Sequence, residues 1–198
     1  MEIDETLQTL ETLYQAIGGY ENYEIWNETS AHDRSLEEIL ASLEDEWGRE
    51  KVGMQRIVDY WSDLHTVGLL DGNWQLNENG KKWARRTEGS VQSLYMTDAD
   101  VIDDRKNLGD IFYTLGTPNA LPTLHLLYQN EDISEQMSPS EIKQPLEVMH
   151  QHNFIQDEPY SKGEFGDGKG VLTERAETVY EEVVEPDYHW LKQEELDL

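Results

Sequence analysis

The sequence has no cysteine, which excludes a disulfide framework, a thiolate nucleophile and a zinc site built on cysteine. It also has no apolar run close to the roughly 18 residues that a membrane-spanning helix needs. The first residues, MEIDETLQ, lack both a basic start and an apolar core, so we expect no signal peptide. These absences together predict a soluble protein of the cytoplasm.

Basic residues are scarce as well. The chain of 198 residues has 15 Lys and Arg against 42 Asp and Glu, a formal net charge of −27. Such a charge repels nucleic acid and the chain itself in dilute buffer, but in molar salt the Debye length falls to about 3 Å and the repulsion is largely screened. Because the acidic excess is spread over both halves, we interpret the composition as that of a halophilic archaeon. The competing interpretation is an acidic DNA mimic or a binder of basic proteins.

The most informative stretch is Ile57–Arg86, whose pattern predicts a helix, a hairpin and the start of another helix. Gly68 stands where a helix commonly ends in a left-handed residue, and Asp71-Gly72 is a strong signal for a two-residue hairpin turn. Asn77 can cap a helix that opens at Glu78. The first helix has an apolar face at helical spacing, formed by Ile57, Val58, Trp61 and Leu64. On the return strand the apolar residues Trp74 and Leu76 alternate with polar ones.

The same order of patterns recurs about 85 residues later. A repeat that preserves the order of helix, strand, hairpin and helix is a stronger signal than matched residues alone, so it predicts two copies of one unit. The matched segments are Leu64-His65 with Met149-His150, Leu69-Leu70 with Phe154-Ile155, and Leu76-Asn77-Glu78 with Leu172-Thr173-Glu174.

This unit resembles the winged helix-turn-helix over Ser35–Arg86 and again over Leu121–Val184. In that family the helix before the hairpin is the recognition helix, and the hairpin is the wing. The chain is similar to haloarchaeal winged-helix transcription regulators, and this resemblance implies a mainly α fold with small β-hairpins (α+β). It also implies a DNA-binding regulator as the commonest role, with protein-interaction modules as a sizeable minority.

The predicted organisation has four parts: winged-helix unit 1 at 1–90, a connector and linker helix at 91–116, winged-helix unit 2 at 117–186, and an acidic C-terminal tail at 187–198. The amphipathic linker helix, Val101–Leu115, either packs one unit on the other or pairs across the axis of a homodimer. We expect a polar loop or short strand at Tyr20–Asp33. Recognition helices are expected at Arg49–His65 and at Pro145–Asn153. The second is expected to begin at Pro145 because proline suits the first turn of a helix. Glu185-Pro186 is expected to end unit 2.

Positive charge is concentrated where such a unit would contact DNA. Trp47–Thr87 holds seven basic and five acidic residues, a net charge of +2, so the rest of the chain carries −29. Lys and Arg bind backbone phosphates, and Arg or Gln can read base edges in the major groove. The expected DNA-binding residues are Arg49, Lys51, Gln55, Arg56, Lys81, Lys82, Arg85 and Arg86. The alternative interpretation of the last four is a solvated helix face.

The second unit carries its few cations among many acids, so we expect it to serve in dimerisation, effector binding or contact with a protein partner. His150 and His152 have no third ligand at a specific spacing, and no nucleophile is paired with a base. The sequence therefore predicts no metal, no cofactor and no enzymatic activity.

The functional prediction is a transcriptional regulator that binds double-stranded DNA mainly through unit 1 and forms a homodimer. One alternative is a tandem winged-helix protein-interaction module, as in a chromosome-organising or regulatory complex, and another is an acidic DNA mimic or anti-repressor. The regulator prediction depends on whether the seven cations of Trp47–Thr87 converge on one exposed ridge, whereas the DNA mimic predicts no positive patch there.

Overall fold

The fold is built almost entirely from helices, which make up 78% of this computed structural model, against 3% strand. The structure describes residues 4–31, 36–47, 54–97, 105–156, 171–194 and 196. The elements are α1 (Glu5–Ile17), α2 (Tyr20–Ala31), α3 (Leu36–Trp47), α4 (Met54–Thr66), α5 (Glu78–Thr97), α6 (Arg105–Leu115), α7 (Ala120–Tyr128), α8 (Ile133–Gln136), α9 (Pro139–Gln151), α11 (Glu174–Val179), the π-helical turn η2 (Tyr180–Val184) and α12 (Glu185–Gln193).

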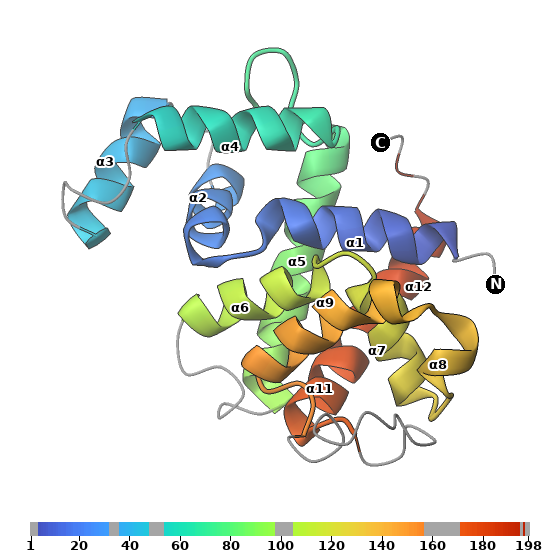
Figure 1. The fold of residues 1–198 in the computed structure, drawn as a ribbon. Coiled ribbons are helices and arrows are strands. Elements are labelled where there is room, and N and C mark those ends of the chain that lie inside the picture. The colour runs from blue at the N-terminus through green and yellow to red at the C-terminus, as the bar shows by residue number, and fades with distance from the viewer. Residues whose placement is uncertain are drawn as a thin grey trace.

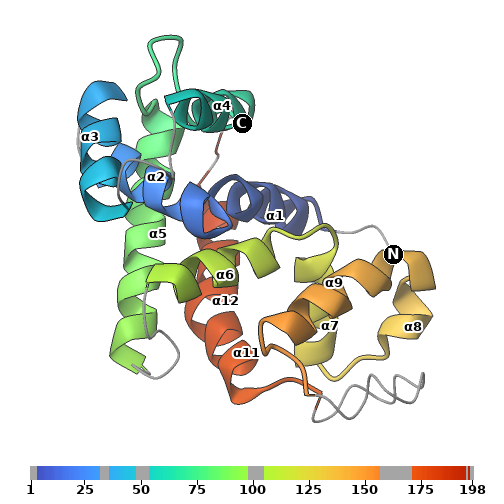
Figure 2. The same cartoon turned by 60° about the vertical axis from the view of Figure 1, so that its left-hand side comes forward.

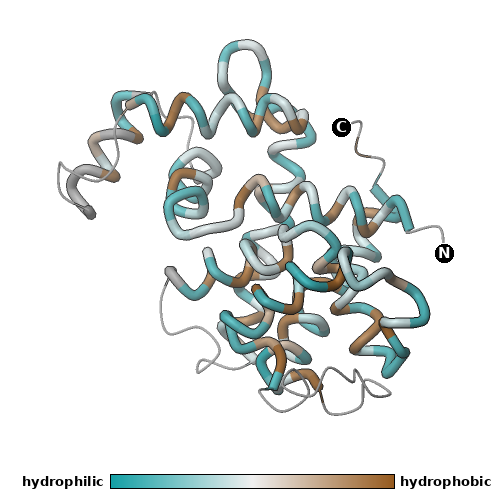
Figure 3. Tube along the Cα trace, in the orientation of Figure 1, coloured by the Kyte–Doolittle hydropathy of each residue, from teal (hydrophilic) through white to brown (hydrophobic). Residues whose placement is uncertain are grey.

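The long helix α5 runs through the molecule, and other helices pack along it (Figures 1 and 2). The run from α11 through η2 to α12 packs along α5, and α1 packs on both α12 and α6. Figure 3 shows apolar segments on helices of both halves of the chain. One continuous hydrophobic core extends from Leu7 to Leu191, so the two predicted units share a single core.

The predicted linker helix is part of this core, because α6 contacts the α1–α2 junction backbone to backbone. The Gly19 N–H donates to the Gly109 carbonyl at 2.8 Å. A Cβ added at Gly18 would lie 2.7 Å from the Tyr113 Cα, and one added at Gly109 would lie 2.7 Å from the Tyr20 Cα. Of the two alternatives for this helix, the structure shows the one in which it packs the two halves on each other.

The predicted α+β fold class is wrong, because the protein is all-α and the described residues form no sheet. Among the described residues, one isolated antiparallel bridge stands in place of each predicted hairpin: Leu70 with Leu76, and Ile155 with Leu172. In the first hairpin the positive φ falls at Trp74 (63°), not at Gly72. The tip of the second, from 157 to 170, lies outside the described residues.

The first hairpin stops after one bridge because the Asp71 side chain competes with the backbone hydrogen bonds that would pair the two strands. Its carboxylate accepts the N–H groups of Asn73 (2.8 Å) and Gln75 (3.1 Å), while the Asp71 N–H donates to the Gln75 carbonyl at 2.8 Å. Asp commonly bonds backbone groups two residues ahead in this way. The chain is thereby closed into a five-residue loop, and strand pairing ends after one residue pair.

Of the predicted internal repeat, the junction between helix and bridge recurs in both halves with equivalent backbone hydrogen bonds. After each helix, an N–H bonds five residues back: Leu69 to Leu64 at 2.9 Å, and Phe154 to Met149 at 2.7 Å. The residue before each donor, Gly68 and Asn153, is left-handed. A polar residue caps each following helix and donates its own N–H to the carbonyl of the residue after the left-handed one. These bonds run from Asn77 to Leu69 at 3.1 Å and from Thr173 to Phe154 at 3.0 Å.

Tyr20–Asp33 was predicted as a loop or short strand, but Tyr20–Ala31 is the helix α2. Its residues from Tyr23 to Trp26 are all buried, because α1, α3, α4 and α6 surround the helix. A helix buried on several sides lacks the one-faced apolar stripe that sequence patterns detect. The predicted recognition helix Arg49–His65 corresponds to α4 from Met54 to Thr66, and residues 49–53 lie outside the described part.

Two prolines lie inside helices that were predicted to break there. Pro145 does not begin a helix, because α9 runs unbroken from its capping box at Ser138 and Glu141 to Gln151. Pro186 does not end the C-terminal helix, which continues from η2 into α12. The π-helical turn immediately before Pro186 changes the hydrogen-bond register, and such turns commonly mark local irregularities of this kind.

Candidate functional site

The exposed face of α4, the predicted recognition helix, carries more acid than base. Asp59 and Asp63 are exposed on adjacent turns, and the Gln55 amide donates to the Asp59 carboxylate at 2.8 Å. The one described cation of α4, Arg56, is turned toward α2, where it bonds the Asn22 side chain at 2.6 Å and pairs with Glu21 at 3.4 Å.

Lys82 and Arg86, two of the predicted DNA-binding residues, point toward the C-terminal helix instead. Lys82 pairs with Glu194 at 2.8 Å, with both side chains partly exposed. The Arg86 Nε donates to the carboxylate of Asp187 at 2.5 Å, and Asp187 is completely buried. Part of the predicted acidic tail at 187–198 is therefore packed into the core as α12.

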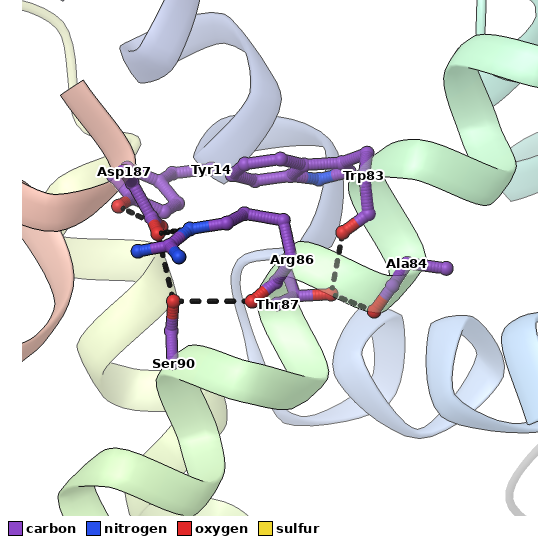
Figure 4. A network of polar contacts seen from close by, with 7 residues as sticks. All are labelled: Tyr14, Trp83, Ala84, Arg86, Thr87, Ser90 and Asp187. Carbon is purple, nitrogen blue, oxygen red and sulfur yellow. Dashed lines mark hydrogen bonds and ion pairs between the residues drawn. The ribbon is translucent and has the colours of Figure 1, made fainter. Parts of the chain in front are cut away.

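Asp187 is the centre of a buried network that joins α1, α5 and α12 (Figure 4). Its carboxylate also accepts the Tyr14 hydroxyl at 2.6 Å and the Ser90 hydroxyl at 2.7 Å. Burial raises the pKa of Asp187, whereas Arg86 and the two hydroxyls act to lower it. Burial and the neighbouring Asp187 raise the pKa of Tyr14 well above its usual value.

Aromatic rings enclose this network and give it a structural character. The Trp83 ring lies 5.7 Å from that of Tyr14 and 6.0 Å from that of Trp190, measured between centroids. Trp83 and Tyr14 are both 0% exposed. A buried charge whose partners are all supplied by the protein leaves no position for a substrate, so the network holds the helices together.

Lys81 and Arg85 lie on the neighbouring face of α5, at a groove between α2 and α5. The cavity has a volume of about 570 Å³, with Tyr23 and Trp26 of α2 among its lining residues. Lys81 makes one exposed ion pair, with Glu78 at 3.4 Å. The Arg85 Nε donates to the Lys81 carbonyl at 3.2 Å.

The predicted DNA-binding residues therefore do not form one ridge in the described structure. Six of them lie in three places: on α4 (Gln55 and Arg56), against the C-terminal helix (Lys82 and Arg86) and at the α2–α5 groove (Lys81 and Arg85). Arg49 and Lys51 lie outside the described residues.

Trp74 is an exposed residue whose place in the fold differs from the sequence prediction. They placed it on a strand, but it stands at the tip of the Asp71–Gln75 loop and is 42% exposed. Its ring lies 6.4 Å from the Trp61 ring and 5.9 Å from the His65 ring. A left-handed tryptophan is an unfavourable conformation for a bulky residue, so the loop and the two rings of α4 hold it there.

In the described part of the second half, Lys143 and His152 also make local contacts. Lys143 pairs with Glu147 at 4.0 Å. His152 lies 3.7 Å from Asp110 and against the Tyr113 ring, and burial lowers its pKa although Asp110 acts to raise it. The described residues contain no group of three or more His, Asp or Glu arranged to hold a metal ion.

Comparison with known protein families, with curated proteins and with solved structures finds no match for this chain. Within the described structure, none of the helices is both long and apolar enough to cross a membrane. Two surface features bear on function: the exposed face of α4 with Trp74 beside it, here named the α4–Trp74 face, and the α2–α5 groove.

Proposed function

We propose that this protein is a protein-interaction module and that its recognition face is α4 with the Asp71–Gln75 loop. The observation that carries the proposal is the exposed Trp74, which is held in a left-handed conformation against Trp61 and His65. Tryptophan and methionine are enriched at protein interfaces, and tryptophan is a frequent hot-spot residue. An aromatic ring fixed at the surface loses little side-chain entropy on binding.

The chemistry of the face indicates the kind of partner. Met54, which is 47% exposed, and His65 lie at one edge of the exposed face of α4, where Trp74 covers the largely buried Trp61 ring and extends that edge. Asp59 and Asp63, four residues apart, form the other edge. This face fits a basic, amphipathic segment of another protein. Phosphates would meet the two carboxylates without a compensating cation from α4, because Arg56 is bonded to α2.

Capture of the partner in molar potassium chloride tests the proposal. The tagged full chain is incubated with extract of its source cells, and the Trp74→Ala variant is compared with Tyr95→Ala. Tyr95 is 45% exposed on α5 and is therefore a matched control for loss of a surface ring. We expect a stoichiometric protein to be retained by the wild type and by Tyr95→Ala but lost by Trp74→Ala. Equal retention by Trp74→Ala would contradict the proposed face.

DNA binding is the second candidate, and the exposed positions of Lys81 and Arg85 favour it. The test is a mobility shift on genomic fragments at high potassium chloride with the double variant Lys81→Glu/Arg85→Glu. Lys82 and Arg86 are left intact, because they hold the C-terminal helix. Loss of a shift in the double variant would support this candidate, whereas an unchanged shift, or none from the wild type, would reject it.

A further inference from the structure

The groove between α2 and α5 has the size and lining of a small-molecule site. Its volume of about 570 Å³ falls within the range of roughly 300–1,000 Å³ that is typical of ligand pockets. Aromatic and aliphatic side chains from two helices and the first hairpin line it, among them Tyr23, Trp26 and Leu76. Tyr23 and Trp26 are themselves buried, so they provide a rigid apolar wall.

The charge of the groove is opposite to that of the molecule. Lys81 and Arg85 are four residues apart and lie on the same face of α5, and both line the cavity with one acid, Glu88. Glu88 accepts a hydrogen bond from the Gln92 amide at 3.3 Å. The cavity wall thus carries a net charge of +1 in a chain whose formal net charge is −27.

The arrangement of Arg85 gives the groove a specific recognition group. Its Nε is held by the Lys81 carbonyl, which orients the guanidinium, and no described acid forms an ion pair with it. In a chain with 42 acidic residues, most other described cations at the surface, such as Lys82 and Lys143, do pair with acids. A guanidinium presents paired N–H donors that match a planar carboxylate.

We propose that the α2–α5 groove binds a small planar aromatic carboxylate. The ring system lies against the wall formed by Tyr23, Trp26 and Leu76, and the carboxylate is held by Arg85 and Lys81. This binding site is separate from the α4–Trp74 face of the proposed function. It requires no protein partner, so it can be tested with the isolated chain.

Titration calorimetry of the full chain with 2-naphthoate tests this site, using 2-naphthamide as the uncharged isostere and 2-naphthyl phosphate as a second anion. We expect 2-naphthoate to bind at one site and to bind about tenfold or more tightly than the amide, because hydrogen bonds to charged groups are the stronger ones. Tighter binding of the phosphate would overturn the assignment to carboxylates. Absence of naphthoate binding would overturn the site.

Variants locate the binding. Lys81→Gln/Arg85→Gln is expected to weaken 2-naphthoate about tenfold, and Ala84→Phe is expected to abolish binding by filling the groove that Ala84 lines. Lys143→Gln, which removes an exposed cation from α9, is the matched control and should bind like the wild type. In the wild type, the indole N–H resonance of Trp26 should shift on binding. Wild-type affinity in both groove variants, or no shift at Trp26, would place the ligand elsewhere and contradict the proposal.

Discussion

Asp187 shows at the scale of single residues how the C-terminus stabilises the N-terminal half of this protein. It is completely buried and receives hydrogen bonds from residues of two other helices. The desolvation of a carboxylate costs several kcal/mol and is offset only when its partners are well placed. The free energy of this cluster therefore depends on Arg86, its one charged partner among the described residues.

Arg86→Gln is expected to lower the free energy of unfolding by about 3 kcal/mol or more at pH 7, because it leaves the buried Asp187 charge without its counterion. Replacing both residues, as Arg86→Gln/Asp187→Asn, should recover most of that loss. Lys82→Gln, which breaks a partly exposed ion pair, should cost at most about 1 kcal/mol. Chemical denaturation of the four proteins measures these values. A loss from Arg86→Gln no larger than that from Lys82→Gln would contradict the role of the network.

The same variant should be less destabilised in acid. Burial raises the pKa of Asp187, and removing Arg86 should raise it further. A carboxyl whose pKa is higher in the folded state binds its proton more tightly there. Its contribution to the free energy of unfolding therefore falls as pH rises from the unfolded pKa, about 3.9, through the folded pKa. The deficit of Arg86→Gln relative to the wild type should thus be smaller at pH 5 than at pH 7, and a constant deficit would show that the charge on Asp187 is not its cause.

Sequence patterns could not find this cluster. Asp187 stands in an acidic segment after Glu185-Pro186, where a solvated tail is the ordinary expectation. Its burial depends on Tyr14, which lies 173 positions earlier in the chain. Local spacing carries no information about such a contact. Likewise, Lys82 and Arg86 read as DNA-binding cations because their acidic partners lie about 100 positions away.

At the scale of elements, the predictions succeeded where a helix had one apolar face and failed where tertiary contacts or a side chain intervened. The apolar faces of α1, α4 and α6 were predicted from spacing. The repeated order of helix, hairpin and helix was predicted too, but an isolated bridge stands where each hairpin was expected. The first hairpin failed because the Asp71 carboxylate, rather than Gly72, shapes the turn. Helix α2 failed because it is buried on several sides.

Asp71→Ala is expected to open the loop that presents Trp74. The variant removes the acceptor of the Asn73 and Gln75 N–H groups, so hydrogen exchange at these two amides should accelerate about tenfold. Asp71→Asn keeps a side-chain oxygen and should preserve most of the protection. Unchanged exchange in Asp71→Ala would show that the loop does not depend on this side chain.

Two glycines make a matched pair for the packing of α6. Gly109→Ala is expected to destabilise the protein by about 1–3 kcal/mol, because its Cβ would lie 2.7 Å from the backbone of Tyr20. Gly89→Ala, in α5, meets nothing within 4 Å and should stabilise the protein by about 0.4–1 kcal/mol through its helix preference. Thermal unfolding compares them, and a neutral Gly109→Ala would contradict the backbone contact between α6 and the α1–α2 junction.

At the scale of the whole molecule, one continuous core extends through both predicted units. The helix α12 contributes Asp187 to a contact with α1 and Trp190 to a contact with α5. The net charge of −27 opposes this compact state at low ionic strength. The boundary between the two halves is therefore a packed interface rather than a flexible connection.

Truncation after Val184 distinguishes one core from two. Without α12, Tyr14, Ser90 and Arg86 lose the carboxylate they share. Amides of α1 should then exchange about a hundredfold faster, which corresponds to a loss of roughly 3 kcal/mol. Two independent units would instead leave the exchange of α1 and α4 unchanged while only the second half is affected. Residue-resolved hydrogen exchange in molar salt makes the comparison.

The distance in sequence between Tyr14 and Asp187 also affects how the protein is made. Helix α1 emerges from the ribosome early, but the carboxylate that its hydroxyl binds is 173 positions later. Long-range contacts of this kind slow folding, and chains generally begin to fold from the N-terminus during synthesis. The Tyr14 hydroxyl of the nascent N-terminal half must therefore wait for its partner until helix α12 has been translated.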